Sequence, residues 1–277
     1  MRRLLVVLGL LASISGAAAQ EFEIPTLRGT DSFVPDAPGP LYRPRWSGFY
    51  VGAQIGYGVT GADFVTSTND LVAHMLRNSE LESEQFPSNW SVLGRSQTGS
   101  SSWGGFFGYN IGWECLILGT ELNYSRTHFS ANSPVFPIER VVSVGSNTDD
   151  VTITGSASMH ITDYGTVRMR AGYETGNFLP YGFVGLAYGR ADLARAASVV
   201  VVQTPASGNA PPVTVTFAES DTKNGAFIWG WAVGGGVELM VAPKVFMRGE
   251  YEFIAFQQVF GIKSQIQTGR VALGYKF

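Results

Sequence analysis

Gln267–Phe277 reads Q-T-G-R-V-A-L-G-Y-K-F, and this last stretch of the chain decides the fold. Apolar and aromatic residues alternate in it with charged or small ones. Because side chains two residues apart share one face of a strand, one face is apolar and the other carries Arg270 and Lys276. In a transmembrane barrel the apolar face meets lipid, an aromatic residue lies at the headgroup level, and the polar face lines the interior. The stretch therefore predicts a membrane-spanning β-strand that ends at Phe277.

Seven further stretches show the same alternation of apolar and polar residues. In Trp46–Val59, for example, Val51 and Ile55 fall on one face and Tyr50 and Gln54 on the other. With the C-terminal strand they give eight predicted strands, at residues 46–59, 103–113, 116–126, 162–174, 178–190, 225–240, 244–256 and 266–277.

The connections between these strands alternate strictly between short and long. Short links fall at residues 114–115, 175–177 and 241–243, and long ones at 60–102, 127–161, 191–224 and 257–265. Outer-membrane barrels have short periplasmic turns and longer extracellular loops on an even number of antiparallel strands. A soluble β-sandwich also alternates, but it need not sort its loops in this way. The sequence predicts an all-β fold, an eight-stranded antiparallel transmembrane β-barrel.

The amino terminus predicts export from the cytoplasm. Arg2 and Arg3 precede an apolar stretch that ends in the small residues Ala17 to Ala19, which is the pattern of a signal peptide. The next segment is rich in proline, which favours an extended linker. We therefore expect a signal peptide at 1–19, a Pro-rich periplasmic leader at 20–45 and the barrel at 46–277, located in the outer membrane after cleavage.

The charge of the chain and its cysteine content exclude one class of partner and one kind of cross-link. Removal of two arginines with the signal leaves 19 − 2 = 17 basic residues against 22 acidic ones, which argues against nucleic acid. Cys115 is the only cysteine in the sequence, so an internal disulfide is excluded. We interpret it as a small residue near a turn, with an intermolecular link or a reactive thiol as the alternatives.

The predicted inner faces carry charges of both signs. An eight-stranded barrel has an interior that side chains can just fill, and buried charges need partners there. We expect a salt-bridged plug, with a narrow ion path as the alternative. The predicted inward charges are Glu114, Glu121, Glu174, Glu238, Glu250 and Glu252 against Arg168, Arg170, Arg248, Arg270 and Lys276.

Aromatic residues lie near the ends of several predicted strands, where tryptophan and tyrosine commonly anchor a barrel at the membrane interfaces. The predicted interface aromatics are Trp46, Trp103, Trp113, Trp229, Trp231, Tyr275 and Phe277.

Catalytic and metal-binding patterns are weak. His128 with Ser130, and Ser158 with His160, each place a histidine and a serine on one face of a strand. Glu139 or Asp163 would orient a histidine there. Serine is common in loops, so we expect no enzymatic activity. The sequence shows neither a zinc-ligand spacing nor a phosphate-binding loop, and we expect no cofactor and no metal. Residues 69–85 predict a short surface helix in the first long loop.

Two stretches carry a resemblance to a known family. At W-S-G-F-Y-V-G-A-Q-I-G-Y-G (Trp46–Gly58) and G-R-V-A-L-G-Y-K-F (Gly269–Phe277) the chain resembles the outer-membrane immunogenic or porin-family surface proteins of Gram-negative bacteria. These proteins are related to opacity proteins and OmpA-type barrels. The resemblance implies a surface antigen with an adhesion or envelope-integrity role, and haem binding in some members.

We therefore expect a surface barrel that acts through its extracellular loops. The alternatives are a small channel for ions or small solutes and, less favoured, surface haem binding or a lipid-modifying hydrolase. The expected partners are outer-membrane lipid and lipopolysaccharide, the barrel-assembly machinery through the C-terminal strand, and cell-wall or envelope proteins.

Overall fold

The computed structural model describes residues 46–90, 92–205 and 210–277. The predicted signal peptide and Pro-rich leader, residues 1–45, lie outside the described residues. The described part of the chain contains nine strands, two α-helices and one short 3-10 helix. The strands are β1 (Gly48–Asp63), β2 (Arg95–Trp113), β3 (Leu116–Asn132), β4 (Ile138–Val144), β5 (Asn147–Tyr173), β6 (Phe178–Pro205), β7 (Val213–Ala242), β8 (Val245–Phe256) and β9 (Lys263–Lys276). The helices are α1 (Asn69–Met75), α2 (Glu80–Gln85) and η1 (Pro87–Asn89).

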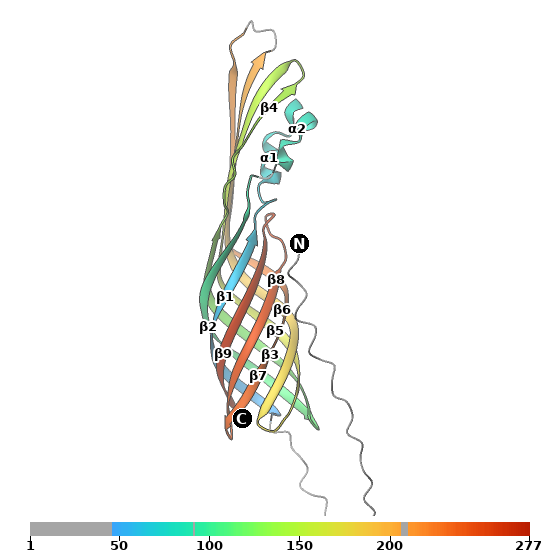
Figure 1. Ribbon diagram of the computed structural model, residues 1–277, viewed down its shortest axis with the longest axis vertical. Coiled ribbons are helices and arrows are strands. Elements are labelled where there is room, and N and C mark those ends of the chain that lie inside the picture. Colours follow the sequence, from blue (N-terminus) through green and yellow to red (C-terminus); the bar gives the residue numbers. More distant parts are fainter. Residues whose placement is uncertain (1–45, 91, 206–209) are drawn as a thin grey trace, which may run out of the picture. The chain divides into compact units, whose positions relative to one another are not determined.

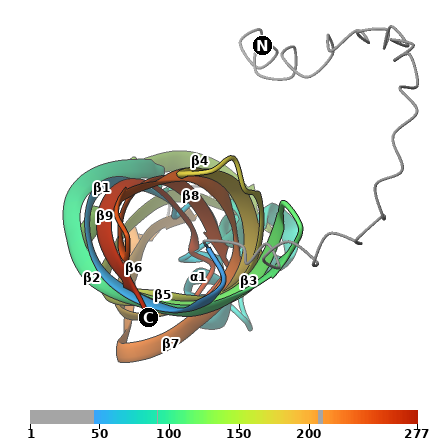
Figure 2. The ribbon, with the colours of Figure 1, turned by 90° about the horizontal axis from the view of Figure 1, so that it is seen from below.

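Eight of the described strands close into an antiparallel barrel. Neighbours around the ring are β1, β2, β3, β5, β6, β7, β8 and β9, and β9 pairs again with β1. The pairing of β3 with β5 closes the ring, which Figure 2 shows from one end. In the described residues β4 pairs with β5 alone and takes no part in the ring. The structure confirms the predicted fold class.

One end of the barrel, here called the turn end, is formed by three tight turns in the described chain. They lie at residues 114–115, 174–177 and 243–244, close to the predicted short links. Glu114 and Gly176 have φ values of 53° and 62°, the left-handed conformation that a tight turn requires. The described chain also begins and ends here, because Phe277 donates its N–H to the carbonyl of Phe49 at 2.9 Å.

The prediction of long loops at residues 127–161 and 191–224 is wrong. Both segments are mostly strand, because β5, β6 and β7 continue beyond the barrel and β4 pairs with β5 there (Figure 1). The alternation of apolar and polar residues also continues: Val151, Ile153, Val199 and Val201 all point to one face and are buried. We call β4, the outer parts of β5 to β7 and the helices packed on them the extension.

Irregularities in strand pairing mark where the barrel gives way to the extension. The register shifts after Arg126 on β3, after Ile161 on β5 and after Ala191 on β6. At the third position Asp192 Oδ1 accepts the N–H of Gly225 at 2.7 Å. Such bulges bend a strand and increase its twist, so the sheet can leave the curvature of the ring.

The helices cover the apolar face of the extension. The predicted surface helix at residues 69–85 is present as two helices, α1 and α2. They bury Leu71, Val72 and Leu81 in a hydrophobic cluster that includes the buried valines of β5 and β6. The hydroxyl of Ser79 accepts the Glu82 N–H and caps α2.

The outer wall of the barrel carries an apolar belt. The outward residues of β9 are apolar from Tyr275 to Val271, with Phe277 directly after the strand, and become polar at Gln267. On β3 the belt ends at Tyr124, and Arg126 follows. No helix in the described residues is long and apolar enough to cross a membrane.

Candidate functional site

A network of buried ion pairs, here called the charge network, crosses the barrel interior. Inward positions on five strands supply it, and each of its side chains is at most 2% exposed. Its members are Glu121, Glu238, Glu250, Glu252, Arg168, Arg170, Arg248 and Arg270.

Each arginine of the charge network contacts at least two glutamates. Arg248 Nη2 lies 2.8 Å from Glu121 Oε2 and 2.7 Å from Glu238 Oε1. Arg170 Nη1 lies 2.8 Å from the same Glu238 oxygen. The eight formal charges sum to zero, so the network presents no net charge that would favour one sign of ion.

Polar residues for which the sequence predicted no site complete the charge network. The hydroxyl of Tyr50 donates to Glu121 at 2.8 Å, and Arg170 lies 4.0 Å from the ring centre of Tyr181. Asn123 accepts from Arg270 at 3.1 Å. The alternation in each strand could have identified these residues as inward-facing. Their partners could not be predicted, because they depend on which strands face each other across the barrel.

Apolar layers close the interior on both sides of the charge network. Towards the extension, buried residues including Ile228, Ile254 and Ile266 continue into the hydrophobic cluster beneath the helices. At the turn end the layer consists of Trp46, Tyr50, Phe106, Ile117, Leu179, Met240 and Phe246. The interior of the described barrel is therefore filled with side chains along its length.

The remaining predicted inward charges lie outside the charge network. Glu174 is buried and Lys276 half-buried, both near the turn end. Glu114 requires a correction, because it is exposed in the tight turn between β2 and β3 and does not face the interior. A two-residue link leaves its side chain no inward position. Cys115, beside it, is an exposed free thiol.

Trp46 is also corrected. It is only 2% exposed, packs against Phe246 with ring centres 5.9 Å apart, and donates from Nε1 to the Gly176 carbonyl at 3.2 Å. It precedes β1 and folds into the barrel end, so it does not meet lipid. The other predicted interface aromatics are exposed on the outer wall, and their depth in the membrane stays a prediction: Trp103, Trp113, Trp229, Trp231, Tyr275 and Phe277.

The predicted histidine and serine pairs come together where the barrel meets the extension. Ser130 pairs with His160 in the β3–β5 register, and the rings of His128 and His160 are 6.3 Å apart. In the described residues no hydrogen bond joins a serine hydroxyl to an imidazole. His74, the third histidine of the sequence, contacts Glu219 at 3.0 Å in the extension. The described residues contain no group of three or more His, Cys, Asp or Glu placed to hold a metal ion.

Arg195 fastens helix α1 to the strands of the extension. Its guanidinium donates to both carboxylate oxygens of Asp70, at 2.7 and 2.8 Å, and to Asp221 at 3.2 Å. It also donates to the Ser67 carbonyl at 2.8 Å and lies 4.5 Å from the ring centre of Phe260. One buried side chain therefore holds α1, β6, β7 and the β8–β9 connection together.

Comparison with known proteins gives one family and several solved structures. The family model described as outer membrane protein beta-barrel domain matches residues 5–277. The sequence matches none of the curated proteins with which it was compared.

Similar solved structures include Ail, the attachment invasion locus protein of Yersinia pestis (11% identity, 83% of this chain and 99% of that one, TM-score 0.31). Neisserial surface protein A is similar at 14% identity (83% and 98%, TM-score 0.38). The outer membrane protein OprG of Pseudomonas aeruginosa is similar at 12% identity (83% and 96%, TM-score 0.30).

Proposed function

The chain belongs to the outer membrane protein beta-barrel family, and from this premise we propose that it is a surface protein whose barrel anchors a rigid extension outside the cell. The extension, rather than the barrel interior, makes the functional contacts. These contacts serve adhesion or envelope integrity. Catalysis has no part in this proposal.

The filled interior carries the proposal. A conducting barrel needs a continuous water-filled path, whereas here the neutral charge network lies between two apolar layers. Opening such a path would separate buried ion pairs, and breaking one buried pair typically costs about 3–5 kcal/mol. Anchoring requires no such rearrangement.

The structure of the extension supports a role in contact. Flexible loops lose conformational entropy when they bind, whereas a preformed surface does not. The hydrophobic cluster of the extension is continuous with the apolar layer of the barrel interior, and Arg195 locks the helix of the extension to its strands. One edge of its sheet, the outer part of β7, pairs with β6 alone in the described residues. An unpaired edge offers backbone donors and acceptors to a partner.

The orientation follows from the two ends of the barrel. Barrels of this membrane place short turns in the periplasm and long connections outside, so we propose that the turn end is periplasmic. We also propose that residues 1–19 are a signal peptide and that residues 20–45 are a Pro-rich leader in the periplasm. We further propose that the leader contacts cell-wall or envelope proteins. The barrel-assembly machinery would recognise β9 together with the exposed Phe277 that follows it.

The test compares the full chain with a barrel cut beyond the bulges, in which residues 65–93, 133–157 and 194–222 are replaced by short polar turns. In gel electrophoresis both proteins should migrate faster when the sample has not been heated, which is the sign of a folded barrel. The full chain should be silent in planar bilayers and support attachment of intact cells to a surface, and the cut barrel should lose attachment. Discrete conductance steps from the full chain would establish the channel alternative, and unchanged attachment by the cut barrel would remove the role of the extension.

A further inference from the structure

Two histidine rings lie close together on the outer surface where the barrel meets the extension. His128 on β3 and His160 on β5 have ring centres 6.3 Å apart, with their planes inclined at 50°. His128 is exposed and His160 is half-buried, so both rings are accessible to solutes. We call these two residues the histidine pair.

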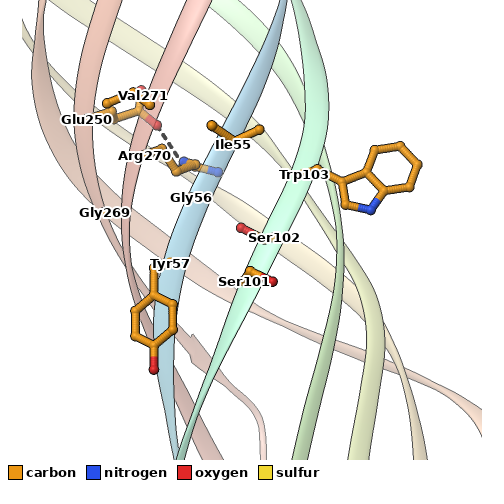
Figure 3. A pocket seen from close by; sticks show the side chains of 10 residues that line it. All are labelled: Ile55, Gly56, Tyr57, Ser101, Ser102, Trp103, Glu250, Gly269, Arg270 and Val271. Carbon is orange, nitrogen blue, oxygen red and sulfur yellow. Dashed lines mark hydrogen bonds and ion pairs between the residues drawn. The ribbon is translucent and has the colours of Figure 1, made fainter.

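A shift in the strand register positions the pair. Where a ladder is regular, outward residues stand directly opposite each other, as Ile55 on β1 and Trp103 on β2 do (Figure 3). Between β3 and β5 the register shifts, so that two residues of β3, Thr127 and His128, lie opposite one residue of β5. A bulge of this kind re-aims a side chain, and here the His128 ring lies diagonally across the ladder from His160.

The ring nitrogens of the histidine pair are available to a ligand. In the described part of the chain, no hydrogen bond or ion pair uses a ring nitrogen of His128 or His160. The third histidine, His74, differs, because it bonds to both Glu219 and Arg77. Neutral imidazole is the commonest protein ligand for metal ions, so the nitrogens of the pair suit such an ion.

The separation of the two rings fits one shared metal ion. A bond between an imidazole nitrogen and zinc is about 2.0–2.1 Å long, which places each ring centre about 3.2 Å from the ion. Two rings on one ion therefore have centres at most about 6.4 Å apart, and about 5.2 Å apart in a tetrahedral site. The observed 6.3 Å lies within this limit. Rotation about χ1 and χ2 of these surface side chains brings the rings to the closer spacing.

The charges around the histidine pair select the kind of ion. Arg126 and Arg190 both stand opposite Asp163 in the neighbouring ladders, so the formal charges of these three residues sum to +1. No carboxylate of the described residues joins the two histidines as a third ligand. Such a site is unsuited to calcium or magnesium, which prefer oxygen ligands. Imidazole nitrogen suits copper, nickel and zinc.

We propose that His128 and His160 bind one divalent transition-metal ion, each through one ring nitrogen, with water at the remaining positions. Copper(II) binds more tightly than nickel(II) or zinc(II), as the Irving–Williams order requires. The expectation from the sequence that the chain binds no metal rested on ligand spacing along the chain. The histidine pair escapes that criterion, because two separate strands bring its members together.

The bound ion joins β3 to β5 at the register shift. The ladder between β2 and β3 ends at Thr127, so in the described residues the outer end of β3, residues 129–132, pairs with β5 alone. Two coordination bonds across the shift hold this end of β3 in place. The site lies on the outer wall and does not rest on the proposed function.

The test measures copper binding by the untagged protein, extracted in mild detergent and freed of metal with a chelator. His128→Gln and His160→Gln each remove one ligand from the surface. His74→Gln is the matched control, because it removes the remaining histidine of the sequence, which bonds Glu219 in the extension. Faster migration of the unheated sample in gel electrophoresis confirms that each variant is folded. Titration calorimetry gives the affinity and the number of ions bound, and electron paramagnetic resonance counts the nitrogen ligands of the copper.

We expect the wild type and His74→Gln to bind one Cu²⁺ whose spectrum shows two imidazole nitrogens. His128→Gln and His160→Gln should each bind at least about tenfold more weakly. Unchanged affinity in either variant, fewer than two imidazole nitrogens in the wild type, or an equal loss in His74→Gln would overturn the site.

Copper should also slow hydrogen exchange at residues 129–132 of the wild type, and not in His160→Gln. Exchange that copper leaves unchanged in the wild type would overturn the role of the ion at the register shift. These measurements involve neither attachment nor conductance, so a failure of metal binding is separated from a failure of the proposed function.

Discussion

Arg168 on β5 and Glu250 on β8 form an ion pair of 2.9 Å across the barrel interior, although their strands are not neighbours in the ring. Two strands, β6 and β7, separate them in the wall. The bond therefore joins parts of the wall that backbone ladders do not connect directly. The charge network braces the barrel as well as filling it.

Glu121 contacts three of the four arginines of this brace, since it accepts from Arg168, Arg170 and Arg248. Glu121→Gln keeps the shape but leaves three buried guanidinium groups short of one negative charge. We expect a loss of about 3–5 kcal/mol in the free energy of unfolding. The measurement is urea unfolding in detergent micelles. The folded fraction at each urea concentration is the share of protein that migrates faster in gel electrophoresis when the sample is not heated. Glu114→Gln, in the exposed turn, should change it by less than about 0.5 kcal/mol; equal losses would contradict the brace.

Trp46 should behave as a core residue. Trp46→Ala removes a buried ring and its hydrogen bond to Gly176, and we expect a loss of about 3–5 kcal/mol in the same unfolding experiment. Trp113→Ala serves as the comparison because Trp113 is 76% exposed on the outer wall. We expect it to cost less. A larger loss of stability for Trp113→Ala than for Trp46→Ala would contradict the buried position and support the predicted interface position of Trp46.

Arg195 should control the order of helix α1 without affecting the barrel. Arg195→Gln removes the bonds to Asp70 and Asp221, whose side chains are partly exposed, so we expect a local cost of about 1–3 kcal/mol. Hydrogen exchange should accelerate over residues 66–85 and stay unchanged in the barrel strands. Arg140→Gln is the control, since Arg140 only stacks on Trp90, at 4.4 Å. Uniform protection in both variants would show that α1 does not depend on Arg195.

Two glycines of the barrel wall should respond oppositely to a methyl group. A Cβ on the inward Gly230 would lie 2.0 Å from the carbonyl oxygen of Ala255, a backbone atom that the ladder holds in place. We expect Gly230→Ala to cost about 1–3 kcal/mol and to lower the yield of refolded barrel. Gly249→Ala meets no atom of the described residues within 4 Å and should refold as the wild type does. Similar yields would mean that the wall relaxes freely.

The alternation of apolar and polar residues can be recognised within each short stretch of sequence. This local pattern was sufficient to predict the barrel strands and which of their residues face inward. Alternation in each stretch identified the eight barrel strands and the inward position of Arg168 and Glu250. It could not say that these two residues meet, because that depends on the tilt and stagger of strands far apart in the sequence. The same limit hid the partners of Tyr50 and Asn123.

The errors have a local cause as well. The alternation that includes Val151 and Val199 is present in the sequence, but it lies beyond the expected length of a membrane strand, so the sequence predicts loops there. Only the helices that cover this face make it a core. Trp46 is a tryptophan directly before a predicted strand, a position typical of interface aromatics. In the structure it lies before β1 and its side chain is buried in the apolar layer at the turn end.

Strands β5, β6 and β7 pass from the barrel into the extension without a break in the chain between them. A force that pulls on the extension is therefore carried along the strand axes into the barrel wall, where it loads many ladder hydrogen bonds in shear at the same time. A tether of ordinary loops would stretch and then yield one contact after another. A cell held through this extension under flow would transmit the drag directly to its outer membrane.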